Sequence, residues 1–93
     1  MPSYRTIMTV TTLAPGRAPE EVEAAARSVT RLESWDIAIA SGQPRVTARF
    51  TATDDAEARA VHREITIAVR IVADVPRARL AAVVRGRSHY LAP

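Results

Sequence analysis

The sequence contains no cysteine and only two histidines, His62 and His89. Without cysteine the chain cannot form disulfides, thiolate nucleophiles or cysteine-based zinc and iron–sulfur sites. The two histidines have few acidic neighbours in the sequence, so we expect no metal and no cofactor. No run of 18 apolar residues occurs, and residues 1–12 lack the charged start and apolar run of a signal peptide. We therefore expect no membrane segment and a cytoplasmic location.

Lysine and asparagine are also absent, so all 13 basic residues are arginines, set against 10 acidic residues. GC-rich codons supply arginine and alanine where AT-rich codons supply lysine and asparagine, and a GC-rich genome is the simplest source of this bias. The resulting net charge of +3 is small. By itself it does not indicate an acidic partner.

The residues that are present predict one folded domain spanning residues 1–93. The apolar share is 47% and the charged share 25%, which is ordinary for a globular protein. Alternating or helical spacing of apolar residues, broken at Ala14-Pro15-Gly16 and Ser41-Gly42-Gln43-Pro44, marks the elements. Asp54 with Glu57 predicts the start of the second helix. We expect strands at about 4–13, 36–41, 45–53 and 77–87, helices at about 19–34 and 55–73, and a tail at 88–93.

This order of elements resembles the ferredoxin-like, split βαβ arrangement. The resemblance covers nearly the whole chain and rests on element order and spacing rather than on a signature motif. It implies an α+β fold, with a four-stranded antiparallel sheet and both helices on one face. The other face of such a sheet meets solvent or a partner.

Strand alternation predicts what the open face of the sheet carries. Ile7 and Met8 are adjacent, so one of them must point outward, and Ala81 and Val83 are expected beside it. Thr47, Arg49 and Thr51 are expected on this face too, with Arg79, Arg85 and Arg87 towards the strand ends. An apolar centre with a polar rim is typical of a protein–protein contact, so we expect a homo-oligomer. On the second helix, Ile67 and Ile71 lie off the buried stripe and form a second candidate interface.

A small-molecule ligand is a further expectation, because Leu13-Ala14-Pro15-Gly16 resembles the loop after the first strand of ACT domains. Those domains bind amino-acid effectors near a glycine in that loop, which makes Gly16 a candidate ligand-binding residue. Here the loop continues with Arg17, Ala18 and Pro19 rather than with apolar residues. A simple turn glycine explains the same pattern.

Two alternatives to an interaction module stay open. Arg49, Arg79, Arg85 and Arg87 are candidate anion-binding residues, and they suit weak binding of nucleic acid to the open face. The chain has few aromatics for base stacking, and Phe50 is expected in the core. A cofactor-free enzyme of the dimeric α/β-barrel type needs an acid or base between two sheets, and the sequence places none there except Asp36. We therefore predict no catalytic residue, and a non-catalytic, homo-oligomerising interaction or regulatory module.

Overall fold

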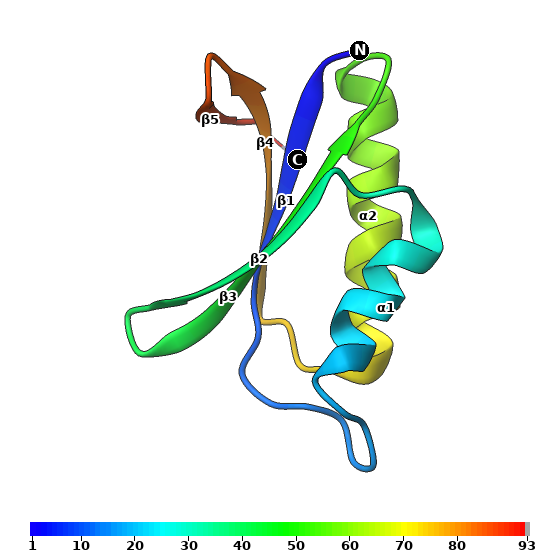
Figure 1. Ribbon diagram of the computed structural model, residues 1–93, viewed down its shortest axis with the longest axis vertical. Helices are drawn as coiled ribbons and strands as arrows, with labels where there is room; N and C mark the ends of the chain where they lie inside the picture. Colours follow the sequence, from blue (N-terminus) through cyan, green and yellow to red (C-terminus); the bar gives the residue numbers. More distant parts are fainter. Residues whose placement is uncertain (93) are drawn as a thin grey trace.

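The computed structural model describes residues 1–92 and shows an α+β fold with an antiparallel sheet of five strands, not the expected four. The strand order is β2-β3-β1-β4-β5, and both helices lie on the same side of the sheet (Figure 1). The elements are β1 (Ser3–Thr9), α1 (Glu20–Val29), β2 (Ser34–Ala40), β3 (Gln43–Thr51), α2 (Asp55–Val72), β4 (Arg77–Val84) and β5 (Arg87–Tyr90).

The core lies between the sheet and the two helices. Its largest fully buried side chains include Tyr4 and Met8 of β1, Phe50 of β3, and Ile65 and Val69 of α2. Fully buried alanines occur on both layers, so the helices approach the sheet closely. The central strand β1 and the long helix α2 thus pack firmly against each other, and together they position the residues on their outer faces.

The start of α2 confirms the cap predicted from the sequence. The Asp54 carboxylate accepts a hydrogen bond from the Glu57 amide at 2.9 Å, and the Glu57 carboxylate accepts one from the Thr53 amide at 3.0 Å. Side chains thereby satisfy amide groups that have no partner within the helix. The Tyr4 hydroxyl also donates to the Asp55 carboxylate at 2.8 Å, which ties β1 to this end of α2.

The segment predicted as a tail contains a strand. β5 pairs with the last four residues of β4, and the connecting turn holds Arg85 and Gly86 at φ values of 52° and 78°. Two consecutive residues with positive φ form the tight hairpin turn whose twist matches paired strands. The alternation read from the sequence ran through this turn to residue 87, whereas the chain reverses at residues 85 and 86. Residue 93 of the predicted tail lies outside the described residues.

The hairpin of β2 and β3 extends beyond the helices (Figure 1). We expected this hairpin to have one buried face, and its β3 half does, through Val46, Ala48 and Phe50. On β2, however, Ile37 and Ile39 are 66% and 71% exposed. The hairpin projects away from α1 and α2, which leaves these two side chains uncovered (Figure 1). The helix α1 also ends at Val29 rather than near residue 34.

The first strand is shorter than predicted, because β1 ends at Thr9 rather than near residue 13. The following residues pair instead with the segment after α2. Thr11 donates its amide to the Asp74 carbonyl at 3.1 Å, and Asp74 donates to the Thr12 carbonyl at 2.8 Å. These bonds hold the C-terminal end of α2 close to the C-terminal end of β1.

Candidate functional site

The open face of the sheet carries only part of the predicted interface. Ile7 and Val83 are half-buried there, but Ala81 is fully buried beside β5, where Tyr90 lies opposite it. The prediction that either Ile7 or Met8 points outward resolves in favour of Ile7. Met8 is wrong as an interface residue, because it lies on the helix side and is fully buried in the core. Of the four predicted residues, only Ile7 and Val83 contribute exposed apolar surface to the open face.

The open face is instead rich in arginine. Strand register places five arginines on it, namely Arg5, Arg45, Arg49, Arg77 and Arg79. Arg5 lies directly opposite Arg49, so like charges are neighbours across the strands. The acidic groups near them are Asp36 on β2 and Glu33, whose carboxylate is 3.6 Å from Arg49 Nε. Arg49 and Arg79 thus lie on the face predicted for them.

Arg85 and Arg87 do not join that face. Arg85 occupies the β4–β5 turn. Arg87 pairs with Val84, which lies on the helix side of β4 like Leu80 and Ala82, so Arg87 lies on the helix side as well. The two arginines flank a shallow hollow at the tip of this hairpin together with His89. Their predicted grouping with Arg49 is therefore wrong, because the turn interrupts the alternation on which it relied.

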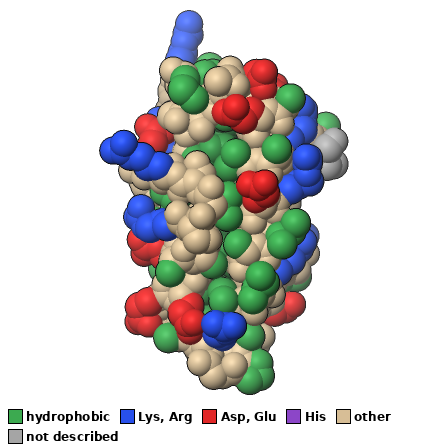
Figure 2. Space-filling view, turned by 90° about the vertical axis from the view of Figure 1, so that its right-hand side faces the viewer, with side chains coloured by type: hydrophobic (Ala, Val, Ile, Leu, Met, Phe, Trp, Pro, Cys, Tyr) green, Lys and Arg blue, Asp and Glu red, His purple; other side chains and the backbone are tan. Residues whose placement is uncertain are grey.

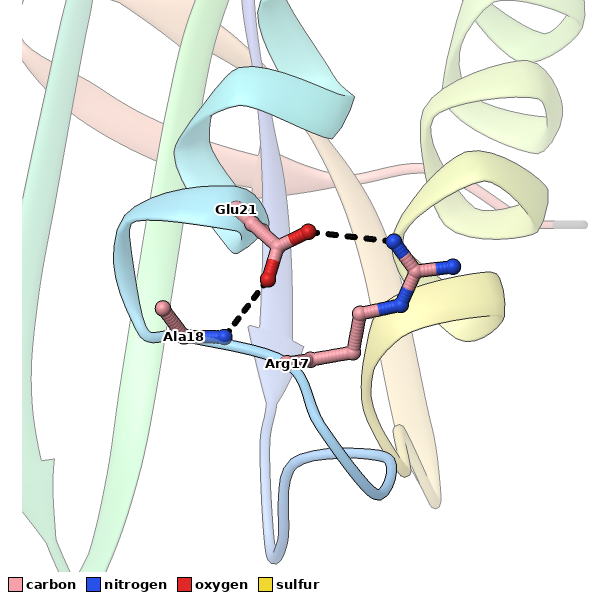
Figure 3. Close-up of polar contacts among 3 residues, drawn as sticks. All are labelled: Arg17, Ala18 and Glu21. Atoms are coloured by element: carbon pink, nitrogen blue, oxygen red, sulfur yellow. Dashed lines mark hydrogen bonds and ion pairs between the residues drawn. The ribbon is translucent and has the colours of Figure 1, made fainter.

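The loop that holds Gly16 has its polar groups satisfied from within. The Glu21 carboxylate accepts hydrogen bonds from the Ala18 amide at 2.6 Å and from Arg17 at 3.0 Å (Figure 3). These two hydrogen bonds lower the pKa of Glu21 below its ordinary value, and the bond from the Ala18 amide has the larger effect. Gly16 itself has a φ of 76°, a conformation that side chains disfavour. The turn therefore accounts for this glycine, and the loop's own carboxylate takes the donors that an acidic ligand would need.

A cleft between α2 and β4 is the best-formed candidate site. Its volume is about 790 Å³. The α2 wall carries Arg59, Arg63, Thr66 and Arg70, whose spacings of four, three and four residues place them on one helix face. The full lining is Arg59, His62, Arg63, Thr66, Ile67, Arg70, Ala78, Arg79, Leu80, Tyr90, Leu91 and Ala92. It includes four arginines and a histidine but no carboxylate side chain.

Two backbone contacts hold the ends of this cleft. Arg59 Nε donates to the Ala92 carbonyl at 3.0 Å, and Arg70 donates from Nε and Nη2 to the Val75 carbonyl at 3.1 and 3.0 Å. Each guanidinium has five N–H donors, so both retain donors for another acceptor. Within residues 1–92, none of the four cleft arginines forms an ion pair with a carboxylate. Figure 2 views the molecule from its helix side, and basic side chains lie along the right-hand margin of that view, next to exposed apolar side chains.

His62 lies on the same wall of the cleft and is held by the core. Its Nδ1 is 3.0 Å from the hydroxyl oxygen of Thr6, a fully buried residue of β1. Burial, followed by the positive charges of Arg63 and Arg70, lowers the pKa of His62. The imidazole is therefore neutral at pH 7, and the charge of the cleft comes from the arginines.

The sequence contained a signal for this cleft that the strand-based prediction did not use. Arg59, Arg63 and Arg70 recur at spacings of four and seven residues, which is the signature of one helix face. Of the four arginine candidates named from the sequence, only Arg79 lines the cleft. The other wall is formed by β4 and the residues after β5. These segments are distant from α2 in the sequence, so local spacing does not predict that they lie beside it.

None of the helices in the described part of the chain is both long and apolar enough to cross a membrane. Comparison of the chain with models of protein families, with curated proteins and with solved structures finds no match.

Proposed function

We propose that this protein is a non-catalytic interaction or regulatory module that binds an anionic ligand in the cleft between α2 and β4. The observation that carries the proposal is the lining of four arginines and a neutral histidine without a carboxylate side chain. Guanidinium groups pair with carboxylates and phosphates through two parallel hydrogen bonds. The volume of about 790 Å³ is of the size that small-molecule sites have.

We also propose that the fold is ferredoxin-like. The strand order β2-β3-β1-β4, with α1 and α2 on one side, supports a ferredoxin-like arrangement to which β5 is added at one edge. In that arrangement the cleft lies where α2 overhangs the sheet edge. The α2–β4 site then replaces the loop at Gly16 as the ligand site of the module.

Titration with inorganic phosphate and with citrate at low salt tests the site. We expect Arg63→Glu to weaken binding by about tenfold or more, because one charge-assisted hydrogen bond to a ligand contributes about 1.5–3 kcal/mol. In the wild-type protein, the bound anion is expected to raise the pKa of His62, which NMR titration of the imidazole measures. Anions favour the protonated form of a neighbouring histidine.

The matched control is Arg31→Glu, which makes the same change of charge at an exposed residue beyond the end of α1. It is expected to leave anion affinity within about twofold, since charges further apart than the Debye length of about 10 Å are screened. Equal weakening by both variants would mean a diffuse effect of net charge, and the proposed site would be wrong.

Nucleic acid on the open sheet face is the second candidate. The observation in its favour is the set of five arginines there, with Arg5 directly opposite Arg49. Like charges at facing positions destabilise a sheet, and a polyanion would relieve that repulsion. In the same titration, a single-stranded oligonucleotide would then bind with a dependence on Arg49→Glu and not on Arg63→Glu. The reverse dependence supports the cleft.

Self-association is the remaining part of the proposed function. Two exposed isoleucine pairs support it, Ile37 with Ile39 on β2 and Ile67 with Ile71 on α2, each residue more than 60% exposed. The arginine-rich open face is less suited to pairing with its own copy, because five arginines from each copy would meet. We expect sedimentation at micromolar concentration to show a dimer that Ile67→Ser with Ile71→Ser, or Ile37→Ser with Ile39→Ser, converts to monomer. A wild-type protein that stays a 10.1 kDa monomer on concentration contradicts self-association.

A further inference from the structure

The outer edge of β4 is only partly covered. β5 pairs with residues 81–84, and the Leu91 amide donates to the Leu80 carbonyl at 2.9 Å. Backbone groups in an antiparallel strand point alternately to its two neighbours. Since the Leu80 carbonyl points away from β1, the N–H and C=O of Ala78 point the same way. No partner for them is present among residues 1–92, and Ala78 lines the cleft.

We propose that the natural ligand of the cleft is an extended acidic segment of another protein, which adds as a strand beside Ala78. This inference rests on the proposed function, because it names the class of ligand that the arginine-lined cleft takes. In such an addition, backbone hydrogen bonds supply affinity and side-chain contacts supply specificity. The outward N–H and C=O of Ala78, which have no partner among residues 1–92, can supply the backbone hydrogen bonds, and the arginines of α2 on the opposite wall can supply the side-chain contacts.

The dimensions suit a short peptide. Arg59 and Arg70 are eleven residues apart on α2, which corresponds to about 16 Å along the helix axis. An extended chain covers that length with about five residues. Arg59 with Ala92 bounds the cleft at one end, and Arg70 with Val75 bounds it at the other.

The charges on both sides of the strand edge favour an acidic sequence. Side chains of an added strand alternate between the two faces of the sheet. One set would meet Arg63 and Arg70 on the helix side, and the other would meet Arg79 on the open face. Acidic residues on both faces of the added strand therefore find cationic side chains.

The same arginines select against the wrong partner. An uncovered strand edge invites pairing with the same edge of another copy, and charged edge residues prevent this. In an antiparallel pair centred on Ala78, Arg77 of each copy would face Arg79 of the other, and this repulsion disfavours the pair. An acidic strand meets attraction at those positions, so β4 selects its partner by charge.

The test uses a six-residue peptide of aspartate and glutamate with blocked ends. We expect it to bind the wild-type protein, to lose about tenfold or more in affinity with Arg63→Glu, and to slow hydrogen exchange of the Ala78 amide. Inorganic phosphate is expected to bind without slowing that amide, because it does not reach across to β4. Amides on the free outer edge of β2, which has no arginine-lined helix beside it, are the internal control.

Backbone methylation of the peptide separates strand addition from simple charge attraction without altering the protein. Two isomers, N-methylated at the odd or at the even positions, carry the same charge. Only one set of amides faces β4, so we expect one isomer to lose binding and the other to keep it. Equal binding of both isomers, or an Ala78 amide that exchanges unchanged, overturns strand addition.

The outcomes also separate this inference from the proposed function. If phosphate binds with the expected dependence on Arg63 while the peptide leaves Ala78 unaffected, the anion site stands and the peptide proposal fails. If neither phosphate nor peptide binds, both fail. Tighter Arg63-dependent binding of a single-stranded oligonucleotide than of the peptide would also overturn the peptide as the ligand.

Discussion

Replacing Phe50 with alanine is expected to lower the free energy of unfolding by about 3–5 kcal/mol. Phe50 is fully buried and stacks on Tyr4 with ring centroids 5.9 Å apart and ring planes at 24°. Truncation would remove the transfer free energy of the ring and leave a cavity between the central strands and α2. Since small domains are stable by only about 5–15 kcal/mol, the variant would be marginal or unfolded at 37 °C.

Urea denaturation followed by the fluorescence of Trp35 measures this loss. Ile39→Ala is the matched control, because it removes an aliphatic side chain that is 71% exposed at the projecting hairpin. It is expected to change the free energy of unfolding by no more than about 0.5 kcal/mol. Similar losses for the two variants would contradict the division of the sheet into a helix-covered part and an uncovered hairpin.

Replacing Thr6 with valine is expected to lower the free energy of unfolding by about 1–3 kcal/mol. Valine keeps the shape of the side chain but removes the hydroxyl that lies 3.0 Å from His62 Nδ1. The half-buried imidazole would then lack its partner in the core. Thr47→Val, on the open face of β3, removes a hydroxyl that solvent reaches and is expected to have little effect. Equal losses from the two would exclude a structural role for the Thr6–His62 pair.

The pH dependence of stability reports on the same histidine. The folded protein lowers the pKa of His62 below its ordinary value of 6.5, so the unfolded chain takes up a proton more readily. Stability should therefore be unaffected by His62 well above pH 6.5, should fall as the pH drops from about 6.5 towards the lowered folded pKa, and should level off below that pKa. His62→Gln should flatten this part of the profile between pH 5 and pH 7.5. An unchanged slope in that variant would assign the pH dependence to other groups.

Local sequence patterns correctly predicted the features that depend only on residues close together in the chain. Asp54 and Glu57 predicted the start of α2 because a helix cap is complete within four residues. Alternation predicted the buried face of β3, since side chains of a strand point to its two sides in turn. The same rule failed at Arg85 and Gly86, where two positive φ angles reverse the chain, and it therefore placed Arg87 on the wrong face.

The extent of each buried face needed the tertiary structure. Ile37 and Ile39 have the pattern of buried strand residues, and they are exposed because their hairpin projects away from both helices (Figure 1). Ile7 and Met8 are adjacent, and the sequence alone did not say which one faces the helices. Packing of the helices on the sheet decided this, and Met8 is the one that lies in the core between the two layers.

The sequence by itself determined that the chain has no thiol chemistry, that arginine is its only basic side chain apart from histidine, and that three arginines share one face of α2. These properties follow from composition and from the period of a helix. Only the tertiary structure decided that this face borders a partly uncovered strand and that no carboxylate side chain enters the space between them. The physical reason is that a cleft is made by pairings distant in the chain, here β1 with β4 and β4 with β5, which no local spacing encodes.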